Sequence, residues 1–97
     1  MMRRIRVLVN GARGRMGSET MKALGEAGDI ETVGGTDLGD DLAAAIRRSR
    51  ADVVVDFTRP ADAFRNFRTI LGAGARQIAG TTGFTTSEIR AAARMAK

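Results

Sequence analysis

Short apolar segments alternate with amphipathic segments four times along this chain, and this alternation limits the fold more than any other feature. The third apolar segment, "DVVVDF" at Asp52–Phe57, is apolar on both faces, as strands inside a parallel sheet are. Parallel strands need a crossover connection, which is usually a helix. The alternation, with its short connections, therefore predicts right-handed βαβ units on a parallel sheet.

Apolar periodicity and the positions of glycine, proline and acidic residues place the ends of these elements. We expect an α/β fold with a Rossmann-type sheet of four parallel strands in the order 3-2-1-4 and helices on both faces, which is a doubly wound domain or the first half of one. The expected strands are Arg4–Asn10, Ile30–Thr36, Asp52–Phe57 and Ala75–Ala79. The expected helices are Arg15–Ala27, Asp40–Arg50, a third that Pro60 opens and Gly72 stops, and a last one after a capping box at Thr85–Glu88.

The same periodicity predicts which helical side chains face the core. Asp40 lies two residues before Leu42, where the apolar run of the second helix begins, and is expected to cap this helix. The predicted inward faces are Ala63, Phe64, Phe67, Ile70 and Leu71 in the third helix, and Ile89, Ala92, Ala93 and Ala96 in the last.

The composition excludes several functions. A chain of 97 residues suits one domain with a single core. It has no cysteine and no histidine, so a disulfide framework, a thiolate metal site and histidine acid–base chemistry are excluded, and no metal is expected. No apolar run approaches the roughly 18 residues of a membrane span or forms the core of a signal peptide. A soluble cytoplasmic protein without a membrane partner is therefore expected.

The net charge of +5 comes mostly from arginine, but it does not indicate a nucleic-acid partner. A single-strand binder would need aromatic side chains among the cations, and the chain has no Trp or Tyr. Basic residues instead gather where the first strand begins and where the second helix ends, at the edge opposite the carboxyl ends of the strands. We interpret them as a solvated rim that helix dipoles favour; they are Arg3, Arg4, Arg6, Arg47, Arg48 and Arg50.

The segment "GARGRMG" spaces three glycines, Gly11, Gly14 and Gly17, three residues apart between the first strand and the first helix. Such repeats also occur in purely structural turns. In this context, however, dinucleotide folds bind a pyrophosphate at the helix N-terminus. Gly11 would permit the tight turn, Gly14 would let the backbone approach the phosphates, and Gly17 would let the helix lie close to the strand.

Asp37 follows the second strand, 20 residues after Gly17, where such folds place an acid for the adenosine ribose. A second interpretation is that Asp37, like Asp40, caps the next helix. Leu38 and Gly39 follow it rather than a base, which favours the 2′-hydroxyl of NAD(H). NADP(H) stays open because Arg13 or Arg15 is near enough in sequence to reach a 2′-phosphate.

Three stretches together resemble the amino-terminal domain of the dihydrodipicolinate reductase family, also called 4-hydroxy-tetrahydrodipicolinate reductase, of diaminopimelate and lysine biosynthesis. They are "GARGRMG" at Gly11–Gly17, "VVVDFTRPADAF" at Val53–Phe64 and "IAGTTGF" at Ile78–Phe84. The resemblance covers essentially the whole chain. The second and third stretches are more specific than the glycine loop, which many dinucleotide folds share.

The resemblance implies an NAD(P)H-dependent oxidoreductase and assigns roles to residues. Gly11, Ala12, Arg13, Gly14, Arg15 and Met16 would line the pyrophosphate, and Asp37 would bind the adenosine ribose. Phe57 and Thr58 would border the cofactor crevice. Gly80, Thr81 and Thr82 would lie beside the nicotinamide and its ribose.

Members of that family continue with a substrate domain that carries a histidine pair, a lysine and a "PSGTA"-like segment. This sequence has no histidine and no such segment, and its two lysines are Lys22, in the first helix, and Lys97, at the end. We therefore expect residues 1–97 to be a dinucleotide-binding domain without its substrate domain, and without catalytic residues or activity of its own. The alternative is a non-catalytic nucleotide-binding or self-associating Rossmann module, in which an open sheet edge pairs with a second copy.

Overall fold

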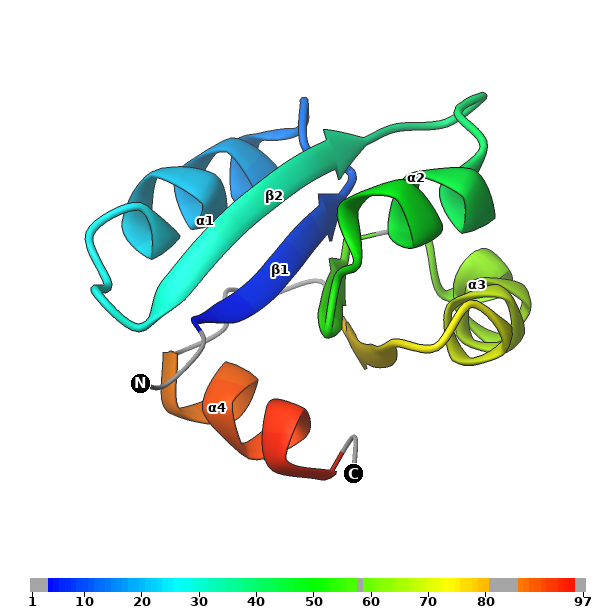
Figure 1. The fold of residues 1–97 in the computed structure, drawn as a ribbon. Helices are drawn as coiled ribbons and strands as arrows, with labels where there is room; N and C mark the ends of the chain where they lie inside the picture. The colour runs from blue at the N-terminus through cyan, green and yellow to red at the C-terminus, as the bar shows by residue number, and fades with distance from the viewer. Residues whose placement is uncertain (1–3, 58, 81–85, 96–97) are drawn as a thin grey trace.

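The computed structural model describes residues 4–57, 59–80 and 86–95, in which strands and helices alternate along the chain (Figure 1). The strands found there are all parallel and form one sheet, as predicted. The elements are β1 Ile5–Asn10, α1 Arg15–Leu24, β2 Ile30–Thr36, α2 Leu42–Ser49, β3 Val53–Asp56, α3 Pro60–Gly72, β4 Arg76–Ala79 and α4 Thr86–Met95.

Helices cover both faces of the sheet, which confirms the predicted layers. Helices α1 and α4 pack on one face, where Leu24 and Ile89 join the inward side chains of the strands. Helices α2 and α3 pack on the other face through Ile46 and Ile70. Figure 1 shows α2 and α3 together at one side of the sheet and α1 and α4 at the other.

The strand order is β2-β1-β3-β4, so the predicted order 3-2-1-4 was wrong. Strand β3 pairs with β1, not with β2. All residues of β3 are buried, whereas most of β2 is only partly buried and Gly35 is exposed. The most apolar strand therefore lies inside the sheet, and the strand weakened by two glycines lies at its edge.

This order places a topological switch point between β1 and β3, because the chain leaves β1 toward β2 and leaves β3 toward β4. In open α/β sheets, ligands bind in the crevice outside the carboxyl ends of the strands at such a point. The loops that follow Asn10 and Asp56 therefore border the expected binding crevice.

Two helix ends differ from the predictions. Helix α1 ends at Leu24, before the predicted end at Ala27, because the chain turns at Gly25, whose N–H still bonds to the carbonyl of Met21. The cap of α2 is Asp41, not Asp40: its carboxylate accepts a hydrogen bond from the N–H of Ala44 at 3.0 Å.

The predicted inward stripe of α3 was mostly wrong. Of its large side chains only Ile70 is buried, whereas Phe64, Phe67 and Leu71 are 70%, 41% and 47% exposed. The helix turns Asn66 toward the sheet instead, where its amide bonds to Asp56. The inward face of α3 therefore includes a polar contact, which apolar periodicity cannot register.

The prediction for α4 was right where the structure describes it, since Ile89 is buried and Ala92 and Ala93 pack against the same cluster. Thr85 of the expected capping box and Ala96 lie outside the described residues. In the part of the chain that is described, no helix is both long and apolar enough to span a membrane.

Candidate functional site

The glycine loop begins with a turn that only glycine adopts easily. Gly11 has a φ of +91°, in the left-handed region, and a Cβ there would lie 3.2 Å from the Cβ of Phe57. The N–H groups of Gly11 and Ala12 both donate to the carbonyl of Thr36, at 2.7 and 3.1 Å. These bonds attach the loop to the carboxyl end of β2.

Helix α1 starts immediately after this turn and lies against it. A Cβ on Gly17 would overlap the carbonyl oxygen of Gly11, so the first turn of α1 can pack this closely only with glycine at position 17. Gly14 is the N-cap and supplies no side-chain hydrogen bond to the helix. The first N–H groups of a helix without such a cap are available to an anion, which the helix dipole also favours.

Asp37 lies directly after β2, opposite the glycine loop. Its carboxylate accepts a hydrogen bond from the N–H of Arg13 at 3.1 Å, and the Arg13 Nε lies 3.6 Å from its second oxygen. The N–H of Asp37 donates to the Asp40 carboxylate at 2.9 Å. Because Asp41 caps α2, the carboxylate of Asp37 is not the helix cap that the second interpretation required.

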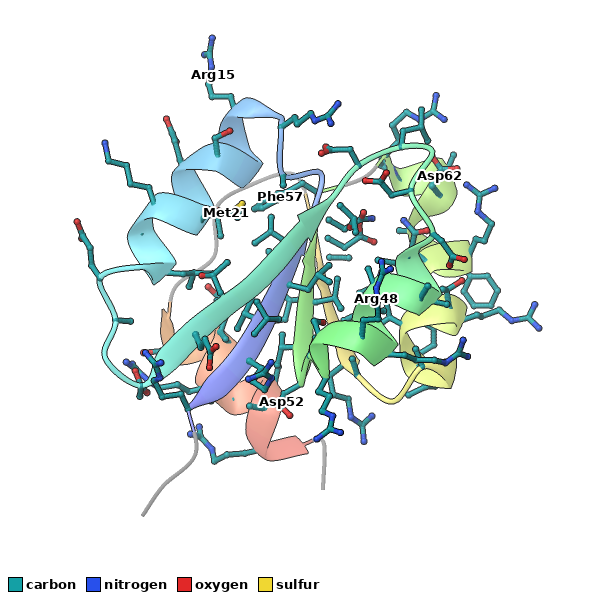
Figure 2. All side chains as sticks on the ribbon, turned by 45° about the horizontal axis from the view of Figure 1, so that its top comes forward. Arg15, Met21, Arg48, Asp52, Phe57 and Asp62 are labelled. Carbon is teal, nitrogen blue, oxygen red and sulfur yellow. The ribbon has the colours of Figure 1, made fainter. Side chains whose placement is uncertain are left out.

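A cleft of about 820 Å³ lies between the start of α1, the β2–α2 loop and the start of α3. Figure 2 shows Phe57 on the α1 side of the sheet, near Met21, and Asp62 at the opposite wall. Arg15 borders the cleft, but its side chain extends away from the protein (Figure 2). The predicted site residues that line the cleft are Gly11, Gly14, Arg15, Met16, Gly17, Asp37 and Phe57.

The other predicted site residues lie elsewhere. Ala12 packs into the α1-side core and lies against Gly35, where a Cβ would come within 2.6 Å of its methyl group. Arg13 contacts the cleft only through Asp37. Gly80 directly follows β4, and its N–H donates to the carbonyl of Asp56 at 3.2 Å. Thr58, Thr81 and Thr82 lie outside the described residues.

The sequence did not predict that residues at the start of α3 form one wall of the cleft. Asp62 accepts from Arg59 at 3.1 Å and from Arg65 at 2.8 Å, and all three residues line the cleft together with Asn66. The stretch "VVVDFTRPADAF" contains Asp62 and Arg59, but their alternating charges did not indicate that they line a ligand site.

Sequence reasoning also missed three buried polar residues beneath the cleft: Asn10, Thr36 and Asp56. Each is the last residue of its strand and directly precedes a residue of the cleft or its loop. For Asn10 and Asp56, a polar residue at the end of a mostly apolar strand was the available signal, whereas β2 also contains Glu31 and Thr32. Among the described residues, no cluster of carboxylates could hold a metal ion.

A parallel sheet with a switch point, a glycine loop over an uncapped helix and an acid after the second strand together define a Rossmann-type α/β domain of the dinucleotide-binding class. Residues 5–97 match the family model described as "Dihydrodipicolinate reductase, N-terminus". The chain belongs to this family, which confirms the resemblance found in the sequence.

Relatives and a solved structure agree with this assignment. The chain is 44% identical over 85 residues to the 4-hydroxy-tetrahydrodipicolinate reductase of Coxiella burnetii (strain RSA 493 / Nine Mile phase I), covering 88% of this chain and 36% of that protein. It is 49% identical over 80 residues to the enzyme of the same name from Beutenbergia cavernae, covering 82% and 32%. A dipicolinate-bound dihydrodipicolinate reductase from Paenisporosarcina sp. TG-14 superimposes with a TM-score of 0.70 at 25% identity, over 92% of this chain and 42% of that one. The chain thus spans about a third of the length of the relatives it matches.

Proposed function

We propose that this chain binds a nicotinamide dinucleotide as the cofactor domain of a 4-hydroxy-tetrahydrodipicolinate-reductase-type oxidoreductase in lysine and diaminopimelate biosynthesis. The observation that carries the proposal is the start of α1. Gly14 leaves the helix without a side-chain cap, and the Gly11 turn holds the loop beside a cleft with Asp37 on its other wall. Such a site suits a ligand with a charged pyrophosphate and a ribose.

In this proposal the backbone N–H groups of the glycine loop and α1 bind the pyrophosphate, with Arg15 adding positive charge at its edge. Asp37 accepts hydrogen bonds from the adenosine ribose. Phe57 and Thr58 border the middle of the crevice. The nicotinamide end reaches the residues after β4, which are Gly80, Thr81 and Thr82.

We infer a preference for NADH over NADPH, because a carboxylate accepts from a 2′-hydroxyl but repels a 2′-phosphate. When bound, the nicotinamide would supply a hydride to a cyclic dicarboxylate substrate. The residues of this chain bind and orient the dinucleotide. Without the substrate domain, residues 1–97 are expected to show no turnover. The cytoplasmic location expected from the sequence is consistent with the proposed role in biosynthesis.

A thermal-shift titration tests the proposal. NADH at 100 times its dissociation constant stabilises a protein by about 2.7 kcal/mol, which is a shift of several degrees for a domain of this size. Asp37→Asn should reduce the shift. The control Glu26→Gln removes the same charge just beyond the far end of α1, away from the cleft, and should leave the shift unchanged. No shift of the unaltered chain at millimolar NADH would refute the proposal.

A non-catalytic, self-associating module remains the second candidate. Within the described residues, β2 pairs only with β1 and β4 pairs only with β3, so each presents one edge to a further strand. Sedimentation at several concentrations distinguishes the two, since a monomer at all concentrations excludes assembly through a sheet edge.

A further inference from the structure

A chain of polar side chains joins the strands beneath the cleft: Asn10, Thr36 and Asp56 are buried at the carboxyl ends of β1, β2 and β3, and Gln77 is partly buried within β4. The Thr36 hydroxyl, at the end of β2, donates to Asn10 Oδ1 at 2.6 Å. Asn10, at the end of β1, donates through Nδ2 to Asp56 Oδ1 at 3.1 Å. Asp56, at the end of β3, accepts through Oδ2 from Gln77 Nε2 of β4 at 2.8 Å. One hydrogen-bonded path therefore crosses the whole sheet.

Helix α3 joins the same path. Asn66 Nδ2 donates to Asp56 Oδ2 at 3.2 Å, and Gln77 Nε2 also donates to the carbonyl of Ala63 at 3.1 Å. The carboxylate of Asp56, which is fully buried, thus receives amide donors from two strands and one helix.

Each strand-end residue of this path adjoins a part of the proposed binding site. Thr36 precedes Asp37, Asn10 precedes Gly11, and Asp56 precedes Phe57. Backbone hydrogen bonds tie the same points together: Phe57 N–H donates to the carbonyl of Asn10 at 2.9 Å, and Gly80 N–H donates to that of Asp56 at 3.2 Å. The path therefore runs below the crevice from its adenosine end to its nicotinamide end.

Burying a carboxylate inside a sheet costs free energy. Removing a charge from water costs several kcal/mol, and apolar residues of similar volume often stabilise a core as well or better. Hydrogen bonds to a charged group are, however, shorter and more directional than apolar contacts, so they fix the relative positions of the groups that they join. A dinucleotide benefits from fixed strand ends, because its two halves bind as linked ligands.

We propose that Asp56, through Asn10 and Gln77, is a positioning residue for the dinucleotide: it holds the glycine loop and the end of β4 with Gly80 at the separation that lets both halves of one cofactor bind together. The proposal rests on the proposed function. It predicts that loss of the carboxylate weakens the coupling between the two halves of the site more than it weakens either half alone.

The experiment compares the affinities of NADH and ADP-ribose, which lacks the nicotinamide, by isothermal titration of the 97-residue chain. Asp56→Asn leaves one acceptor oxygen for three amide donors. It should lower NADH affinity about tenfold while changing ADP-ribose affinity less than about twofold. Gln77→Leu removes the bond from β4 to Asp56 and the bond to the carbonyl of Ala63, but it keeps Asp56 bonded to Asn10 and Asn66. It should show the same selectivity to a smaller degree. If Asp56→Asn does not fold, Gln77→Leu still tests the positioning role.

Val54→Ala is the matched control, because Val54 is fully buried on the same strand and contributes no side-chain hydrogen bond. It should lower the melting temperature without separating the two affinities. An unaltered chain that binds neither ligand would refute the proposed function instead. The positioning role is overturned if the unaltered chain binds NADH no more tightly than ADP-ribose. It is also overturned if Asp56→Asn and Gln77→Leu weaken both ligands equally.

Discussion

The Arg13 guanidinium and the Asp37 carboxylate meet at the mouth of the cleft, with Nε 3.6 Å from Oδ2, while the Arg13 N–H donates to the other carboxylate oxygen at 3.1 Å. The side chain of Arg13 is 90% exposed and that of Asp37 is 24% exposed. An ion pair this exposed contributes about 1 kcal/mol at most, so the guanidinium can leave the carboxylate at little cost. This end of the cleft therefore presents both a hydrogen-bond acceptor and an exposed cation.

This pair yields a prediction about cofactor choice. Arg13→Ala removes the cation that would offset the charge of a 2′-phosphate beside Asp37. NADPH affinity should fall about fivefold or more, and NADH affinity should stay within about twofold. Paired titrations with both cofactors measure the ratio.

Arg47→Ala is the control, because it removes the same charge from the exposed end of α2, away from the cleft. It should leave the ratio of the two affinities unchanged. Equal losses for both cofactors on Arg13→Ala would contradict this account of Arg13.

The close contact of α1 with the glycine loop predicts a large effect of one methyl group. Gly17→Ala places a Cβ against the carbonyl of Gly11, so the loop or the helix must move. We expect a loss of about 1–3 kcal/mol in the free energy of unfolding and a weaker NADH shift. Gly28→Ala is the control, since a Cβ there meets nothing within 4 Å. Equal urea midpoints for the two variants would show that the contact does not constrain the loop.

The ion pair between Asp29 and Arg90 predicts part of the pH dependence of stability. Arg90 Nη2 lies 2.8 Å from the Asp29 carboxylate and joins α4 to the turn before β2. The hydrogen bond from Arg90 is the main reason that the pKa of Asp29 lies below its ordinary value. The folded chain therefore binds this proton less tightly than the unfolded chain. The pair stabilises the fold above about pH 4, and this contribution is lost as the pH falls below that value.

Asp29→Asn should accordingly flatten the decline of stability between neutral pH and about pH 3, as measured by urea unfolding at each pH. Glu26→Gln, which removes a nearby exposed carboxylate, should leave the decline as it is. A decline that is identical in the Asp29→Asn variant and the unaltered chain would show that the pair does not contribute.

The rotation of α3 predicts opposite outcomes for two apolar side chains. Ile70→Ala should cost about 2–5 kcal/mol, because Ile70 is fully buried beneath the helix. Phe64→Gln should cost less than about 1 kcal/mol, because Phe64 is 70% exposed and stacks against Phe67, which is itself exposed, with ring centroids 6.4 Å apart. Chemical unfolding measures both, and a larger cost for Phe64→Gln would mean that the outward face of α3 is covered in solution.

Local patterns were sufficient to predict the elements and the glycine loop. Gly11 and Gly17 have the roles that the motif assigned, since one makes the turn and the other the close helix contact. The position of Asp37 was also predictable from its distance along the chain, whereas its contact with Arg13 was not predicted. These features depend on residues near one another in sequence, and periodicity registers such residues well.

The strand order, the rotation of α3 and the buried polar path were not predictable in the same way. The strand order follows from the pairing of β3 with β1, and the polar path centres on Asp56, whose partners come from β1, α3 and β4. Apolar periodicity places Phe64 and Phe67 inward, whereas the structure bonds Asn66 to Asp56 and leaves both rings exposed. Tertiary hydrogen bonds of this kind leave no repeat in the sequence.

The strand order has a consequence for how the site is assembled in time. The glycine loop is a local structure, but its neighbour in the crevice is not, since Asn10 and Asp56 are 46 residues apart in the chain. Contacts of such long sequence separation close a large loop and therefore form late and slowly. A folding intermediate that contains only β1, α1 and β2 would have the glycine turn but would lack β3, which pairs with β1 in the complete sheet. The ability to bind would thus arise together with the completed sheet, and a nascent or partly unfolded chain would not sequester nucleotide.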